Sequence, residues 1–166
     1  MPIIWRESMT IGHPTIDSQH KYLFCLINAV ELAMQVENPA KVTGFYLDQL
    51  IEYTRIHFED EEKIQIAINY PQHYEHKSEH REIIENLKDL KARLLPETAN
   101  PEMTESAGQV EEARLERMGD KTLADVVDFL RHWILDHVLH TDIQMKPYLR
   151  SQKIDPTRNN PVFRSR

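Results

Sequence analysis

The chain has 166 residues and a mass of 19.6 kDa, close to the usual size of one domain, and 40% of its residues are apolar. It contains only four glycines and 8% aromatic residues, so the composition favours helices and argues against an all-β architecture. Twenty Lys and Arg against 27 Asp and Glu give a net charge of −7, which repels phosphate backbones and anionic headgroups. We therefore expect neither nucleic acid nor a membrane surface as a partner.

The single cysteine and the lack of long apolar runs predict the cellular setting. Cys25 has no second cysteine to pair with, so no internal disulfide requires an oxidising compartment, and we expect it to be a small core residue. The first residues lack the apolar run of a signal peptide, and no stretch approaches the roughly 18 apolar residues of a membrane span. These features favour a soluble, cytoplasmic protein.

The first 17 residues are expected to form an arm, because proline and glycine interrupt any helical periodicity there. Asp17 can cap the first long helix, which we expect to continue to about Glu37. Asn38 and Pro39 form a second start signal, a capping residue followed by proline at the first helical position. This second helix is expected to end at Asn69, which can adopt the left-handed conformation.

Two further helices follow. Pro71 can open a third helix that continues to Leu95, where Pro96 stops it. Asp120 can cap a fourth helix over 121–141, and Pro147 is expected to limit any continuation.

The segments outside these helices define the expected domain organisation. We expect one bundle domain over 1–150, interrupted by a long mobile link at 96–119. The C-terminal tail, 151–166, is rich in proline, asparagine and arginine and is expected to be flexible.

Each expected helix has an inward-facing stripe of apolar residues, spaced alternately by three and four. Ionisable residues interrupt these stripes at a few positions. They are His20 in the first helix, His57 and Glu61 in the second, His76 and His80 in the third, and His137 in the fourth. An inward polar group without a partner costs about 2 kcal/mol or more. In an all-α, up-down-up-down four-helix bundle these positions all fall in one layer, because the first and third helices start where the second and fourth end.

A layer of imidazoles and carboxylates inside an apolar bundle is typical of a metal site. The pairs His57/Glu61 and His76/His80 are one turn apart on one face, so both members can reach one centre. Asp142 lies about 140° around an ideal helix from His137, so it joins the layer only through a sideways side chain or a distorted last turn. Five histidines and two acids are too many ligands for one tetrahedral zinc and suit two octahedral ions that share the carboxylates.

These residues together resemble the hemerythrin family, especially bacterial hemerythrins. The matching motifs span roughly residues 5–148, and the combination is far more specific than any one of them. They are Ile11-Gly12-His13-Pro14-Thr15-Ile16-Asp17-Ser18-Gln19-His20, His57-Phe58-x-x-Glu61-Glu62, Tyr70-Pro71, His76-x-x-x-His80 and Trp133-x-x-x-His137-x-x-x-x-Asp142.

The resemblance implies a bundle holding two non-haem iron ions, bridged by an oxo or hydroxo group, with dioxygen as the partner that binds reversibly. By motif position, one iron would be held by His76, His80 and His137, the other by His20 and His57, and both by Glu61 and Asp142. The iron with two histidines keeps an open position in this family. The implied role is oxygen carriage, storage, delivery or sensing, without enzymatic turnover.

Four apolar residues lie within a turn of these positions and can exclude water from the site: Leu23, Phe58, Trp133 and Val138. Ordinary core packing explains them equally well. Gln65 and Asn69 stand where the family usually has methionine and glycine, and we expect them to affect packing and helix termination and to leave the chemistry unchanged.

The remaining charged and histidine residues are expected at or near the surface. Apart from Glu61, the acidic run 59–62 is expected to be solvated. The unassigned histidines are expected to be surface groups or to lie just outside the ligands, although His73, one turn before His76, can compete as a ligand. They are His13, His73, His132 and His140.

Two other functions fit the same residues. A diiron enzyme acting on nitric oxide, peroxide or an oxidisable substrate needs a similar ligand layer. A metal-free interaction bundle would instead bind a partner protein through the 96–119 link.

Overall fold

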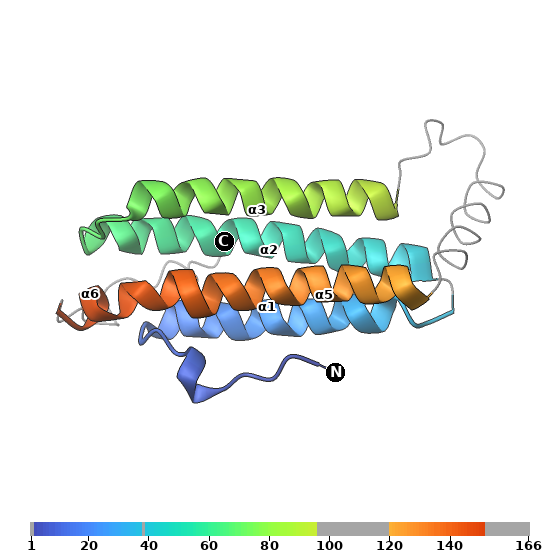
Figure 1. Cartoon of the computed structure of the whole chain (residues 1–166), viewed down its shortest axis with the longest axis horizontal. Coiled ribbons are helices and arrows are strands. Elements are labelled where there is room, and N and C mark those ends of the chain that lie inside the picture. The colour runs from blue at the N-terminus through green and yellow to red at the C-terminus, as the bar shows by residue number, and fades with distance from the viewer. Residues whose placement is uncertain (1, 38, 96–119, 152–166) are drawn as a thin grey trace, which may run out of the picture.

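The computed structural model describes residues 2–37, 39–95 and 120–151, and within these ranges all regular structure is helical. Four long helices lie side by side in one bundle with successive helices antiparallel (Figure 1), which confirms the predicted all-α, up-down-up-down fold. In chain order the elements are η1 (Glu7–Met9), α1 (Pro14–Ala33), α2 (Pro39–Ala67), α3 (His73–Leu94), α5 (Asp120–Asp136), η2 (His137–Thr141), η3 (Asp142–Met145) and α6 (Lys146–Ser151).

The start of α1 differs from the sequence prediction. The helix begins at Pro14, where proline needs no hydrogen-bonded N–H, and it ends at Ala33 instead of Glu37. Asp17 therefore lies inside the first turn. Its carboxylate accepts hydrogen bonds from the backbone N–H groups of Ile11 and Gly12, at 2.8 and 3.2 Å, so it fastens the arm to the helix.

The turn between α2 and α3 follows the prediction at one residue and departs from it at another. Asn69 has a φ of 51°, the left-handed conformation expected at this helix end. The third helix begins at His73, later than the expected start at Pro71.

The fourth helix is interrupted. α5 ends at Asp136 and a π-helical turn, η2, follows it directly. Pro147 does not end the helical region, because it sits in the first turn of α6, where a missing N–H costs nothing.

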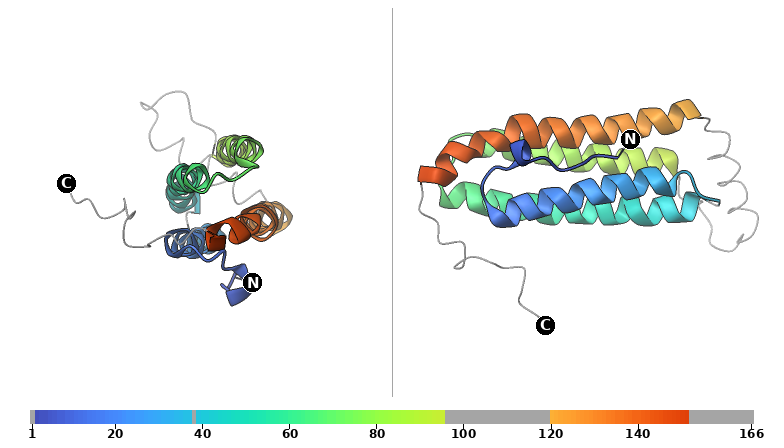
Figure 2. Two further views of the ribbon diagram at one scale, coloured as in Figure 1. Left: turned by 90° about the vertical axis from the view of Figure 1, so that its left-hand side faces the viewer. Right: turned by 90° about the horizontal axis from the view of Figure 1, so that it is seen from below.

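The arm runs along α1 and α5 (Figure 2) and is held at both ends. Near its start, the Asn28 side chain accepts a hydrogen bond from the N–H of Ile3 and donates one to its carbonyl, at 2.8 and 2.9 Å. Near its end, Lys146 Nζ donates to the carbonyl of Thr10 at 2.7 Å. The arm therefore connects the bundle to the segment that follows the π turn.

The apolar core has two parts. The larger cluster contains side chains from the arm and all four long helices, including Leu23, Leu50, Leu87 and Leu130. The smaller cluster occupies the end of the bundle where α2 turns into α3, and it comprises Ile11, Ile16, Ile68, Tyr70, Met145 and Leu149. The predicted inward stripe of α3 is buried at every position: His76, His80, Ile83, Leu87, Leu90 and Leu94.

Several predictions about the periphery have mixed outcomes. Cys25 is exposed, so the expectation of a core cysteine is wrong. The expected link (96–119) and nearly all of the expected tail (151–166) lie outside the described residues. Among the residues described, no helix has the length and apolarity to cross a bilayer.

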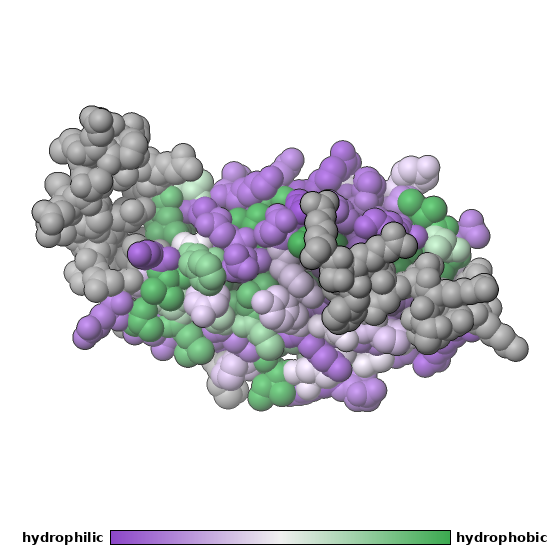
Figure 3. All heavy atoms as spheres, turned by 180° about the vertical axis from the view of Figure 1, so that it is seen from behind, coloured by the Kyte–Doolittle hydropathy of each residue, from purple (hydrophilic) through white to green (hydrophobic). Residues whose placement is uncertain are grey.

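Apolar side chains are interspersed with hydrophilic ones over one long face of the molecule (Figure 3).

The positive φ of Asn69 generates a stability prediction. Replacing Asn69 with alanine places a Cβ in the left-handed region without the local hydrogen bonding of asparagine, and should lower the free energy of unfolding by about 1 kcal/mol. Asn69→Gly, the matched control, should show no loss. Urea unfolding of the three proteins measures the difference, and equal stability of the alanine and glycine variants would contradict the assigned conformation.

Candidate metal centre

Seven ionisable side chains from α1, α2, α3 and the segment that follows α5 meet in one buried layer of the bundle. None is more than 4% exposed: His20, His57, Glu61, His76, His80, His137 and Asp142. The layer lies between the two apolar clusters, since α1 and α2 contribute to the larger cluster on one side of their polar positions and to the smaller cluster on the other. The structure thus brings together every predicted ligand position.

The layer divides into two groups whose candidate ligand atoms all lie within 4.8 Å of one another. One group contains His76, His80 and His137, and the other contains His20 and His57. Glu61 and Asp142 belong to both groups. This is the division of residues that the motif positions imply.

The carboxylate oxygens of Glu61 and Asp142 lie about 3 Å from histidine Nε2 atoms of the layer. His76 Nε2 lies 3.0 Å from an oxygen of Glu61 and 3.0 Å from Asp142 Oδ1. His137 Nε2 lies 3.1 Å from the same Asp142 oxygen, while His20 Nε2 lies 3.1 Å from the other, Oδ2. Asp142 therefore faces one group with each oxygen.

The π turn explains how Asp142 reaches the layer. Its backbone N–H bonds to the carbonyl of His137, five residues earlier, so one extra residue is accommodated within the turn. In a regular helix the two side chains would point in different directions. The structure confirms the expected distortion of the last turn.

Five inward atoms of the layer have no hydrogen bond: His20 Nε2, His57 Nε2, Glu61 Oε2 and both oxygens of Asp142. Buried polar atoms without partners cost about 1–3 kcal/mol each, so native structures rarely leave them in a group. Imidazole nitrogens and carboxylate oxygens are all donors to transition-metal ions. The donor set therefore fits metal cations, which would satisfy these atoms together.

The carboxylates favour the protonated form of two histidines of the layer. Burial alone would lower the pKa of His76, but the nearby carboxylates of Asp142 and Glu61 raise it to about 10. His137 also has a raised pKa, because Asp142 outweighs its burial. The pKa of Asp142 is well below its usual range, since the surrounding histidines overcome desolvation.

Two histidines, His57 of one group and His80 of the other, have lowered pKa values. Burial lowers the pKa of His57 well below its ordinary value, and the neighbouring His20 lowers it further. The pKa of His80 is lowered by burial and then by His137 and His76. Their neutral rings keep a lone pair for a metal ion.

Three polar residues bond the outer ring nitrogens, and the sequence analysis did not identify them. Gln19 Oε1 lies 3.1 Å from His57 Nδ1, Glu62 Oε1 lies 3.2 Å from His80 Nδ1, and Gln65 Nε2 lies 2.9 Å from His76 Nδ1. Such partners fix ring orientation. The expectation that Gln65 affects packing alone is therefore wrong.

The acidic run is likewise less exposed than predicted. Asp60 is 9% exposed and accepts a hydrogen bond from Gln19 Nε2 at 3.0 Å. Glu62 also pairs with Lys77 at 2.5 Å. The expected solvated face holds only for Glu59, because Asp60 and Glu62 each bind a partner on another helix.

Of the four predicted water-excluding residues, Phe58 has the clearest contacts. Its ring stacks on His80 at 3.7 Å and 4°, and lies 5.4 Å from the rings of His57 and His137. Leu23 and Val138 are fully buried in the larger cluster, and Trp133 is partly buried against it. The sequence analysis missed Trp5 of the arm, whose ring lies 6.4 Å from His20.

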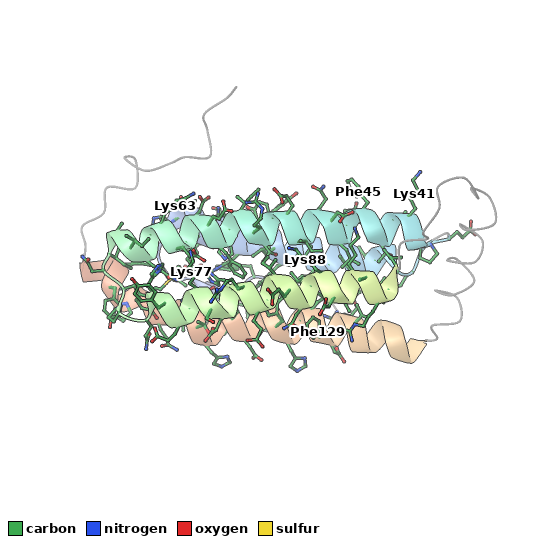
Figure 4. The ribbon with its side chains drawn as sticks, turned by 90° about the horizontal axis from the view of Figure 1, so that it is seen from above. Lys41, Phe45, Lys63, Lys77, Lys88 and Phe129 are labelled. Carbon is green, nitrogen blue, oxygen red and sulfur yellow. The ribbon has the colours of Figure 1, made fainter. Side chains whose placement is uncertain are left out.

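A cavity of about 290 Å³ opens outside Phe58 and His80, between α2 and α3. Charged side chains line its rim, including Arg55, Glu62 and Lys88. Figure 4 looks onto these two helices and labels Lys77 and Lys88 of α3 along this side. Phe58 lines this cavity and also belongs to the larger cluster, and its ring stacks on His80.

The remaining histidines lie outside both groups. His132 and His140 are exposed, as predicted, while His13 is buried beside the start of α1 with a pKa lowered by burial. His73 is partly buried, and its Nδ1 lies 2.9 Å from Gln65 Oε1. It therefore contacts a partner of the layer and does not join the layer.

A four-helix bundle in which three helices and the turn after the fourth supply buried histidines and carboxylates to one layer is typical of a metal-binding bundle. The family model of the Hemerythrin HHE cation binding domain matches residues 12–149. The chain therefore belongs to the hemerythrin family, whose members bind oxygen at a diiron site.

Individual relatives agree with this family. A hemerythrin-like protein of Naegleria gruberi is 23% identical over 149 residues, which cover 89% of this chain and 94% of the relative. A bacteriohemerythrin of Clostridium acetobutylicum is 23% identical over 143 residues, covering 84% and 95%. A crystal structure of wild-type hemerythrin has the same fold, with a TM-score of 0.67 and 22% identity over 90% of this chain and 98% of that one.

Because protons occupy part of the layer, cation binding should release them. Zn²⁺ added to metal-free protein at pH 7 should displace at least one proton per chain, from His76, whose pKa is about 10, and its affinity should fall as pH decreases. Calorimetry in two buffers of different ionisation enthalpy measures the release. The control variant His132→Ala, which changes an exposed histidine, should release as many protons as wild type. Zn²⁺ binding without proton release would contradict the protonation of His76.

Proposed function

We propose that this protein holds two non-haem iron ions and binds dioxygen reversibly. In this proposal His76, His80 and His137 hold one ion, His20 and His57 hold the other, and Glu61 and Asp142 contact both. The observation that carries it is the division of the layer into two groups that share both carboxylates. Two shared carboxylates are the arrangement expected for a pair of octahedral ions in a bundle core.

The iron pair would supply the electrons for reversible dioxygen binding, and the protein supplies the ligands and the surroundings. The His20 and His57 side has one histidine fewer than the other, so it is the side with room for a small molecule. Imidazole-rich ligation favours retained iron and a carrier, whereas carboxylate-rich sites in bundles are more typical of oxidation catalysts. We therefore propose a carrier, storage, delivery or sensing role without enzymatic turnover.

The apolar surroundings support binding over turnover. Phe58, Leu23 and Val138 are at most 3% exposed and pack in the larger cluster beside the layer. A site that excludes water slows proton delivery. Because dioxygen needs protons to leave as peroxide, slow proton delivery favours reversible binding. Trp133 and Trp5 extend this apolar environment.

The proposal is tested by an anaerobic-to-aerobic optical titration with iron quantification. Protein reconstituted with ferrous iron should contain about two irons per chain, and its oxygenated spectrum should bleach under vacuum and return on re-exposure. Rapid irreversible oxidation, or turnover with added reductant, would instead identify an enzyme. Less than about one iron per chain would remove the basis for any diiron function.

The residue assignment makes a prediction about His57. His57→Ala removes a ligand from the side with only two histidines, so the iron content should fall from about two to about one per chain. Iron analysis and the optical spectrum provide the measurement. His132→Ala, an exposed histidine on α5, should retain both ions, and unchanged iron in the His57 variant would refute its assignment.

The apolar surroundings make a second prediction. Phe58→Ala should admit water beside His80 and His57 and increase the rate of irreversible oxidation of the oxygenated form by about tenfold. The decay of the oxygenated spectrum gives this rate. Phe45→Ala is the matched control, since Phe45 is 58% exposed on the same helix. Equal lifetimes of the oxygenated form in the two variants would show that Phe58 contributes to core packing and does not protect the site from water.

A further inference from the structure

Gln65 is the one residue of α2 that contacts two ligand positions and a histidine outside the layer, among the residues the structure describes. It is fully buried, one turn after Glu61. Its Nε2 donates to Glu61 Oε1 at 2.8 Å and lies 2.9 Å from His76 Nδ1. Its Oε1 lies 2.9 Å from His73 Nδ1.

These contacts fix the amide. Nε2 donates a hydrogen to Glu61 and lies against His76 Nδ1, and the oxygen faces His73 Nδ1, so both polar ends of the buried amide contact polar side chains. Met145 Sδ lies 3.6 Å from the same nitrogen. These contacts hold the amide in place, because moving it would leave buried polar atoms unpaired.

We propose that Gln65 is a positioning residue for His76 and Glu61, and that His73 acts on the metal centre through Gln65 and not as a ligand. The inference rests on the proposed ions, since it concerns how firmly His76 and Glu61 hold them.

The outer-nitrogen contacts give the physical reason. A ligating imidazole is oriented by the partner of its other nitrogen, and loss of such a partner typically weakens metal binding 10- to 100-fold. Gln65 is that partner for His76, as Gln19 is for His57 and Glu62 is for His80. Gln65 differs from Gln19 because it also contacts a carboxylate of the layer, Glu61.

The link to His73 places the end of this network at the α2–α3 turn. His73 is the first residue of α3 and is partly buried, and its N–H bonds to the carbonyl of Tyr70 at 3.3 Å. Its ring packs beside Tyr74, which is 81% exposed. A change at this turn therefore has a direct hydrogen-bonded path to the three-histidine group.

The experiment uses Co²⁺ as the probe, because its visible absorption reports coordination geometry. Gln65→Met, close in size and without hydrogen bonds, should shift the Co²⁺ bands and release the ion to a chelator 10 to 100 times faster than wild type. Gln35→Met is the control, since Gln35 is exposed at the end of α1 and bonds only to a backbone carbonyl in the part described. Thermal unfolding of each metal-free protein separates folding defects from positioning.

A double-mutant cycle tests the role of His73. His73→Phe should shift the bands in the same direction, with a smaller increase in Co²⁺ release, and should add nothing in the Gln65→Met background. This variant keeps the inference testable if Gln65→Met folds poorly. If the effects of the two substitutions on Co²⁺ release add, His73 does not act through Gln65, and the role proposed for His73 is wrong.

The outcomes separate this inference from the proposed function. If wild type binds Co²⁺ and Gln65→Met matches Gln35→Met in spectrum and release rate, the positioning role is wrong and the metal centre stands. If wild type binds no Co²⁺, the metal centre fails and the inference fails with it.

Discussion

The structure depends on the burial of seven ionisable side chains in the centre of a helical bundle. Removing imidazoles and carboxylates from water costs several kcal/mol unless partners replace the lost hydration. Here the partners are the groups themselves and the cations that their unpaired inward atoms fit. The apolar clusters on both sides exclude water, which strengthens every electrostatic interaction within the layer.

Much of the irregular structure near the layer follows from this constraint. The π turn breaks a regular helix so that Asp142 can face both groups with its two oxygens. Gln19, Glu62 and Gln65 lie where helices meet and hold the outer nitrogens of the histidines. Local departures from ideal helix geometry and polarity therefore concentrate where function is proposed, as expected when a site is costly to build.

The two groups of the layer have different electrostatics. The three-histidine group includes two rings with raised pKa values, because Asp142 and Glu61 stabilise their protonated forms. His57, on the other side, is kept neutral by burial and by His20. The layer is therefore electrostatically uneven, since its carboxylates favour protons on His76 and His137 while burial keeps His57 and His80 neutral.

Helical periodicity was enough to predict the four helices, their inward stripes and six residues of the layer, because it is local and places each side chain on a face. The sequence also indicated that Asp142 joins them only through a sideways side chain or a distorted turn, since five residues do not complete a regular helical repeat. The contacts between segments revealed that Asp17 fastens the arm, that Cys25 is exposed, and that Asp60, Glu62 and Gln65 hold partners inside the bundle. Those positions lie at the edges of the stripes, where the neighbouring helix or segment determines the contacts, and one helix carries no information about its neighbour's side chains.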